Sequence, residues 1–177
     1  MGLDMYLCRK QHAQPGGQDA LRVTQKATGD IVVEPELTTS LTEEIGYWRK
    51  ASHIHKWFVD NVQKGKDDCE EYDVSRHQLE KLQTVVDKVV EHSKLVPGNV
   101  SVGQTLQGTE WVDTLKEGLV IADPAVAMAL LPRQKGFFFG GEGYDQWYVE
   151  DLNLTLRILK EALGSYNNVK FTYQSSW

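Results

Sequence analysis

Two segments of alternating apolar and polar residues, one near each end of the chain, constrain the fold most strongly. Over residues 2–9, Leu3, Met5 and Leu7 occupy every second position. Residues 169–174 (VKFTYQ) alternate in the same way. A period of two residues is typical of a strand with one buried face. Because a lone strand leaves its backbone N–H and C=O groups unsatisfied, we predict that the two end segments join one sheet.

The residues after the first strand add to this sheet. Residues 15–17 (PGG) are typical of a turn, and residues 20–24 and 30–34 read as short strands. Residues 28–30 (TGD) suit a hairpin turn between them. The N-terminal third is therefore predicted to form a small antiparallel sheet.

Three longer segments have apolar residues at helical spacing. The first covers residues 44–62, with apolar side chains at positions 47, 51, 54, 58 and 62. The second begins at Ser75, with Gln78 as its capping-box partner. The third covers residues 145–163, with Asp145 as its N-cap and a stop at Gly164.

These elements predict an α+β fold: a small, mainly antiparallel sheet that includes both chain ends, covered by three main helices. At 177 residues, one domain spanning residues 1–177 is expected. Repeated glycines make residues 94–122 a loop or a hairpin excursion. Residues 123–131 suit a short helix that Pro132 ends.

Charge and cysteine content narrow the class of protein. A net charge of −6 argues against general nucleic-acid binding, which needs a basic surface. Cys8 and Cys69 are the two cysteines and form no CxxC motif, so a disulfide scaffold is not expected. No apolar run approaches the roughly 20 residues of a membrane helix. The sequence predicts a cytoplasmic protein that does not associate with membranes.

A first group of candidate ligand-binding residues lies in the predicted 44–62 helix. Lys50, His53 and Trp57 share one flank of that helix, away from the apolar stripe. The Trp ring could stack on a planar ligand while the two basic groups hold an anion. The alternative is that Trp57 covers a second packing surface and the basic groups are solvated.

A second group lies in residues 131–145 (LPRQKGFFFGGEGYD), where Arg133 and Lys135 precede three Phe residues and several glycines. The Phe run suits a strand with rings on both faces, and a helix N-terminus follows it. Arg133, Lys135 and Tyr144 with that N-terminus predict an anion site. The alternative is a buried strand, a tight turn and Asp145 as a simple N-cap.

The sequence gives little support to metal binding or catalysis. His53 and His55 are two positions apart, so on a helix their rings point in nearly opposite directions. Residues 67–71 (DDCEE) are an acidic connector of the kind that is usually solvated. No cofactor and no metal ion are expected. The terminal Trp177 is expected to dock onto the core, a partner or the rim of a pocket.

Four segments together resemble a family of small uncharacterised proteins found in phages, prophages and bacterial genomes. They are MGLDMYL at the start, GYWRKASHIHKWFVDNVQ with DDCEEY, LLPRQKGFFFGGEGYDQWY, and YQSSW at the end. The excursion at residues 94–122 is longer than this resemblance implies. Small accessory proteins of phages often act by stoichiometric binding, so the resemblance favours a binding protein.

Three functions remain open. The favoured one is an accessory protein that sequesters a small anionic, nucleotide-like ligand or a host signalling molecule. The others are a protein-binding inhibitor of a host factor, and a small hydrolase of a nucleotide-type substrate with His53 or Asp68 as acid or base. Trp147, Leu154 and Ile158 form a second apolar stripe on the last helix. A monomer that covers this stripe internally is favoured over a homodimer.

Overall fold

A four-stranded antiparallel sheet forms the base of the molecule. A computed structural model describes residues 2–12, 39–164 and 169–177. The strand order is β2-β1-β6-β3, and the bounds are β1 (Asp4–His12), β2 (Ser40–Arg49), β3 (Tyr72–Val74) and β6 (Lys170–Ser176). The two end strands are neighbours, with Leu7 opposite Tyr173, as predicted. The turn predicted at 15–17 and the strands predicted at 20–24 and 30–34 lie outside the described residues.

The inner face of the sheet forms part of the core. Leu3, Met5 and Leu7 are fully buried, and so is Tyr173 on β6. The alternation seen in the sequence therefore reports the buried face directly. The ring of Phe58 stacks on Tyr173 at 3.9 Å between centroids, and this contact seats the first helix on the sheet.

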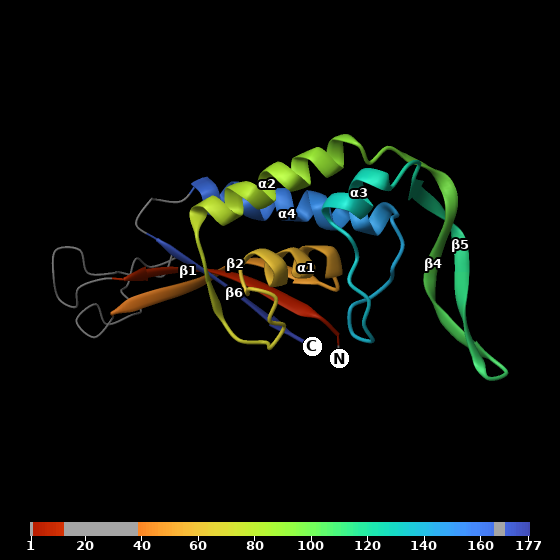
Figure 1. The fold of residues 1–177 in the computed structure, drawn as a ribbon, viewed down its shortest axis with the longest axis horizontal. Coiled ribbons are helices and arrows are strands. Elements are labelled where there is room, and N and C mark those ends of the chain that lie inside the picture. The colour runs from red at the N-terminus through yellow and green to blue at the C-terminus, as the bar shows by residue number, and fades with distance from the viewer. Residues whose placement is uncertain (1, 13–38, 165–168) are drawn as a thin grey trace, which may run out of the picture.

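The described residues form four helices on one side of this sheet, so the α+β prediction is confirmed. Their bounds are α1 (Ser52–Asn61), α2 (Arg76–Glu91), α3 (Ala125–Leu130) and α4 (Gln146–Gly164). Figure 1 shows α2 and α4 running side by side above α1 and the strands. No helix in the described part of the chain has both the length and the apolar character needed to cross a bilayer.

The helix predicted over residues 44–62 is wrong in its first half. Residues 40–49 form β2, which pairs with β1, and the helix begins only at Ser52. Lys50 separates the two elements because its backbone is left-handed, with φ at 60°. A right-handed helix cannot pass through such a residue. Of the five positions at helical spacing only Tyr47 lies on β2, and it is 40% exposed, whereas its neighbours Gly46 and Trp48 are buried.

The starts of the other two predicted long helices are confirmed. The Ser75 hydroxyl accepts a hydrogen bond from the Gln78 backbone N–H, and the Gln78 side chain accepts one from the Ser75 backbone N–H. The Asp145 carboxylate accepts from the backbone N–H groups of Trp147 and Tyr148, at 3.1 and 3.2 Å. Each cap satisfies donors that the first helical turn leaves free.

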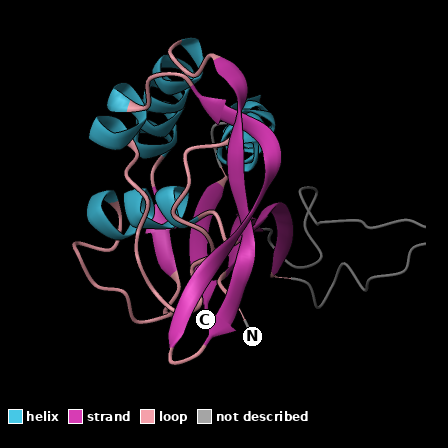
Figure 2. Ribbon diagram, turned by 90° about the vertical axis from the view of Figure 1, so that its right-hand side faces the viewer, coloured by secondary structure: helices cyan, strands magenta, loops and turns pink. Residues whose placement is uncertain are grey.

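Residues 95–121 form a long hairpin at one end of the molecule, made of β4 (Leu95–Gln107) and β5 (Glu110–Ile121). Figures 1 and 2 show it standing beside the helices and reaching from their level down to that of the chain ends. The backbone N–H of Ile121 donates to the Tyr144 carbonyl at 2.9 Å. The backbone N–H of Leu119 donates to the Gln146 side chain, also at 2.9 Å. The hairpin is thus tied to the segment that leads into α4.

The strand predicted for the three Phe residues is wrong. Residues 136–139 form a turn, in which the Phe139 backbone N–H donates to the Gly136 carbonyl at 3.1 Å. Phe137 is 96% exposed, whereas Phe139 is buried. A turn resolves the conflict of three consecutive rings, because it lets only one of them enter the core fully.

The second apolar stripe of α4 is covered within the chain at Ile158. The methyl groups of this residue pack directly over Gly46 of β2. The other side of α4 contacts α2, so the helix is sandwiched between the sheet and another helix. The cover comes from β2, not from residues 123–131 or from a helix over 44–62. Trp147, at the start of the stripe, stays 40% exposed.

Candidate functional site

A cleft of about 270 Å³ lies where the end of β2, the segment before α4, the hairpin and the first turns of α4 meet. Two of the six predicted site residues, Lys50 and Arg133, line it. The charged and aromatic side chains that line the cleft are Arg49, Lys50, Arg133, Asp145, Trp147, Glu150 and Asp151.

Lys50 is held in a strained conformation at the rim of this cleft. Its φ of 60° is costly for a residue with a side chain, by roughly 1–2 kcal/mol. Its backbone N–H donates to the Leu3 carbonyl at 2.8 Å, and its carbonyl accepts from Ser52 at 2.9 Å. A Cβ on Gly140 would lie 3.0 Å from the Lys50 Cβ, so these backbones approach closely. Strain of this kind persists where the surroundings enforce it, which is common at ligand sites.

The Arg133 side chain is held by Tyr148 and by the Gly143 carbonyl, close to the Asp151 carboxylate. The Arg133 side chain is only 8% exposed, and its guanidinium carbon lies 5.1 Å from the centre of the Tyr148 ring. Its Nε donates to the Gly143 carbonyl at 3.2 Å. One terminal nitrogen lies 3.9 Å from the Asp151 carboxylate, beyond hydrogen-bond distance. Arg133 therefore presents a fixed positive charge to the cleft.

His53 and Tyr144 lie around the same tyrosine. The ring centroids of His53 and Tyr144 are 4.2 and 5.0 Å from that of Tyr148. The Tyr144 hydroxyl accepts from the Arg133 backbone N–H at 3.2 Å. Three predicted residues thus converge on Tyr148, to which the sequence assigned only a core position.

His53 does not act as the cation that the sequence suggested. It is fully buried, and neither ring nitrogen has a hydrogen-bond partner among the described residues. Burial and the nearby Arg133 charge lower the pKa of His53 well below its usual value. The ring is therefore neutral at physiological pH and supports Tyr148 from the core side.

Trp57 and Lys135 do not line the cleft. Trp57 is 7% exposed and belongs to the core, with its ring edge-on to Phe58 at 5.4 Å. Packing is thus its role, as in the alternative interpretation. Lys135 is exposed and forms an ion pair with Glu142 at 2.9 Å. The aromatic residue of the cleft is instead Trp147.

The helix N-terminus does not provide the predicted anion site. The backbone N–H groups of Trp147 and Tyr148, which have no partner within the helix, already donate to the Asp145 carboxylate. An external anion would have to compete with a side chain of the chain itself. The positive charge of the cleft comes from side chains rather than from the start of α4.

Asp151 is the carboxylate whose ionisation the cleft affects most. Burial raises the pKa of Asp151 to about 7, and the Arg133 charge opposes this rise. Near neutral pH the group is therefore partly protonated. The net charge of the cleft becomes more positive as the pH falls below 7.

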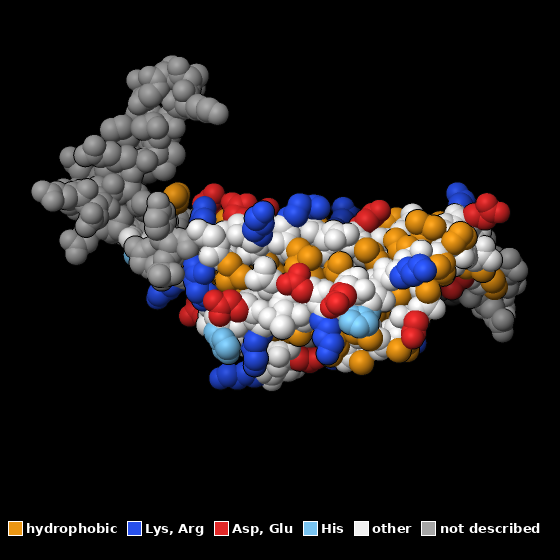
Figure 3. All heavy atoms as spheres, turned by 90° about the horizontal axis from the view of Figure 1, so that it is seen from above, with side chains coloured by type: hydrophobic (Ala, Val, Ile, Leu, Met, Phe, Trp, Pro, Cys, Tyr) orange, Lys and Arg blue, Asp and Glu red, His pale blue; other side chains and the backbone are white. Residues whose placement is uncertain are grey.

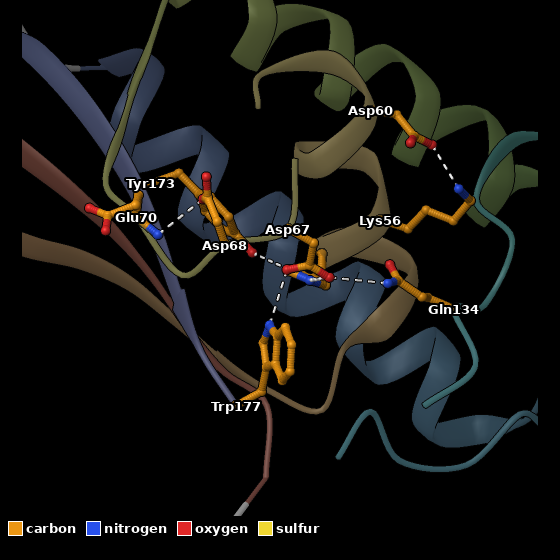
Figure 4. Close-up of polar contacts among 9 residues, drawn as sticks. Lys56, Asp60, Asp67, Asp68, Glu70, Gln134, Tyr173 and Trp177 are labelled. Atoms are coloured by element: carbon orange, nitrogen blue, oxygen red, sulfur yellow. Dashed lines mark hydrogen bonds and ion pairs between the residues drawn. The ribbon is translucent and has the colours of Figure 1, made fainter. Parts of the chain in front are cut away.

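A second polar cluster, which sequence reasoning missed, centres on Asp67 (Figure 4). One Asp67 oxygen accepts from the Trp177 indole N–H at 3.0 Å. The other accepts from the Gln134 amide at 3.2 Å and lies 3.0 Å from His55 Nε2. The acidic connector and the terminal Trp were visible in the sequence, but nothing there indicated that they meet.

The arrangement around His55 identifies its tautomer. A carboxylate only accepts, so Nε2 carries the proton that is donated to Asp67. Nδ1 then accepts from the Tyr173 hydroxyl, 2.8 Å away. Burial lowers the pKa of His55, although Asp67 opposes the shift. Burial also raises the pKa of Tyr173 well above its usual value, so the His55 ring and the Tyr173 hydroxyl are both neutral.

The Asp67 cluster has the geometry of a structural lock. His55 and Tyr173 are fully buried, so a substrate cannot reach these two members of the cluster. The contacts join α1, the connector, residue 134 and the chain end, and Trp177 docks on Phe139 with ring centroids 5.7 Å apart. In the described part of the chain, no group of three or more His, Cys, Asp or Glu side chains is placed to hold a metal ion.

Figure 3 shows basic and acidic side chains mixed over the helical face, with hydrophobic ones along its middle and toward the hairpin end. Such a mixed face differs from the continuous basic surface that nucleic-acid binding needs.

No protein family model, no curated protein and no solved structure matches the chain.

Proposed function

We propose that the chain is an accessory binding protein of phage type that sequesters a small anionic, nucleotide-like ligand in the cleft. The observation that carries this proposal is the strained Lys50 at the cleft rim, next to Arg49. Neither side chain has an ion-pair partner among the described residues. These two cations are therefore available to an anion, and Arg133 lines the same cleft.

The remaining groups suit a ligand with a planar ring. Trp147 is 40% exposed and lines the same cleft. An indole face can stack on a base, which is worth about 1–3 kcal/mol per base. A ligand held by its anionic group at the cations and by its ring on Trp147 has the chemistry of a nucleotide.

The hydrolase alternative gains less from this geometry. His53 is buried behind Tyr148. The Asp68 carboxylate accepts from the Tyr72 hydroxyl at 2.8 Å and from the Glu70 backbone N–H at 3.3 Å. Neither residue lines the cleft. Sequestration needs only binding, and it is the function that these contacts support best.

The test is retention of a nucleotide from a cell extract by the pure protein, identified by mass spectrometry after denaturation. Lys50→Met and Arg49→Met should each reduce retention by about tenfold, since each removes one charge from the site. Lys64→Met is the matched control, because Lys64 is also exposed and left-handed but does not line the cleft. Equal retention by all variants would contradict the proposal, and turnover of the retained nucleotide would favour the hydrolase.

One observation favours the protein-binding alternative. On one face of the hairpin, Leu106, Leu115 and Leu119 are 54%, 57% and 40% exposed. Exposed apolar side chains that share one face can mark a protein-binding surface, although Glu117 separates Leu115 from Leu119 on this one. Under this alternative, Leu115→Glu would abolish capture of a host protein, whereas Lys50→Met would leave it unchanged.

A further inference from the structure

The first turns of α4 place an aromatic ring and two carboxylates on the same side of the cleft. Trp147, Glu150 and Asp151 are spaced i, i+3, i+4, so they share one face of the helix. Arg49 and Lys50 enter the cleft from a different element, the end of β2. The cleft therefore receives Arg49 and Lys50 from one side of the fold and Trp147 with two carboxylates from α4, and Arg133 lies 3.9 Å from one of these carboxylates, that of Asp151.

Neither carboxylate has a hydrogen-bond donor in the described part of the chain. Glu150 is exposed and makes no ion pair there, and Asp151 is 3.9 Å from the closest Arg133 nitrogen. Asp145 differs, because its oxygen is already used by the helix N-terminus. A purely anionic ligand would gain nothing from Glu150 and Asp151 and would be repelled by them.

We propose that the ligand carries an amino group on its ring in addition to its anionic group, as in an adenine nucleotide. This inference rests on the proposed function. The anionic group binds Arg49 and Lys50, the base stacks on Trp147, and its exocyclic N–H groups donate to Glu150 and Asp151. A donor at Asp151 also stabilises the charged form of a carboxyl whose pKa burial raises.

Two probes that differ only at this group test the inference. Adenosine 5′-monophosphate has the exocyclic amine, and purine riboside 5′-monophosphate lacks it and has no other N–H on its base. Isothermal titration should give adenosine monophosphate an affinity about tenfold higher, since a hydrogen bond to a charged acceptor contributes on that scale. Inorganic phosphate should bind more weakly than either.

Variants of the carboxylates locate the difference. In a Glu150→Met, Asp151→Leu double variant, the preference should fall below about twofold, while purine riboside monophosphate binds as well or better because repulsion is removed. Glu150→Met alone keeps the test valid if the double variant does not fold, since Glu150 is exposed, and it should lose part of the preference. Asp87→Met removes an exposed carboxylate of α2 and should leave the preference unchanged.

The outcomes separate the two proposals. Equal binding of the two nucleotides, with both weakened by Lys50→Met, overturns the amino-group inference and leaves the anion site standing. A preference that survives the double variant also overturns it. No binding of either nucleotide overturns both proposals, and binding of a free aromatic amino acid in their place would assign the cleft to a different class of ligand.

Discussion

The guanidinium of Arg133 lies over the ring of Tyr148, with 5.1 Å between the guanidinium carbon and the ring centre. This contact fixes the loop before α4 onto the helix itself. Tyr148 is fully buried, and its hydroxyl donates to the Leu131 carbonyl at 3.0 Å, so its polar end is satisfied within the core. A buried tyrosine thus links the core to the charged cleft.

Substitution of Lys50 by Gly should separate strain from function. Glycine adopts a positive φ without steric cost, so Lys50→Gly should raise the free energy of unfolding by up to about 1 kcal/mol. It should also reduce nucleotide retention by about tenfold, because it removes the same charge as Lys50→Met. Lys64→Gly, at a φ of 55°, should give the same gain in urea unfolding and retain the ligand. Loss of stability in Lys50→Gly would show that its backbone is not strained.

Gly46→Ala should destabilise the protein by about 1–3 kcal/mol through overpacking. A Cβ at this position would lie 2.4 Å from the Ile158 Cγ2. Ile158→Ala alone leaves a cavity, but in the Gly46→Ala background it should cost much less, so the double-mutant cycle shows coupling. Gly141→Ala serves as the control, because nothing lies within 4 Å of its added Cβ. Additive costs at 46 and 158 would contradict this packing.

Asp67→Asn should cost about 1–3 kcal/mol of stability. The two oxygens of Asp67 accept from three donors, and an amide replaces one oxygen with a donor group. Asp68→Asn is the neighbouring control and should change stability by less, because its carboxylate is exposed. Urea unfolding of the two variants would compare them directly, and equal costs would argue against the lock.

Acid should destabilise the protein through His53. The native pKa of this residue is lowered, so below about pH 6.5 the unfolded chain binds a proton that the native state does not. Stability contributed by the neutral ring is thus present above pH 6.5 and lost as the pH falls. His53→Gln should reduce the acid slope by about 1.4 kcal/mol per pH unit, which is one proton. Unfolding free energies between pH 5 and 8 would show an unchanged slope if the native ring were protonated.

Asp151 should have the opposite effect. Its native pKa of about 7 lies above the ordinary value of 3.8, so the native state binds the extra proton between these limits. The carboxylate therefore lowers stability above pH 7, and this cost disappears as the pH falls toward 4. Asp151→Asn should stabilise the protein by about 1–3 kcal/mol at pH 8 and by much less at pH 5. A gain that does not depend on pH would contradict the burial of this charge.

Much of the fold followed from local patterns. Ser75 and Gln78 define a helix start through their own hydrogen bonds, and Leu3, Met5 and Leu7 define a buried face by alternation. Both signals operate within a few residues. They hold in the structure because local preference and tertiary packing agree there.

The errors arose where tertiary contacts decide. Residues 44–49 had helical spacing, yet pairing with β1 makes them a strand, and the positive φ of Lys50 has no signature in its side chain. The candidate site was half predicted for the same reason. Lys50 and Arg133 were identified by charge, whereas Trp147 joins them only because the loop before α4 folds back on the helix.

The pairing of β1 with β6 has a consequence for synthesis of the chain. β1 is an inner strand of the sheet, and one of its edges stays open until residues 170–176 have been made. Closing so long a loop is entropically costly, and contacts this distant in sequence slow folding. The α2–α4 pair is separated by fewer residues and can form earlier. The nascent chain must therefore keep the apolar face of β1 from aggregating until β6 has been made.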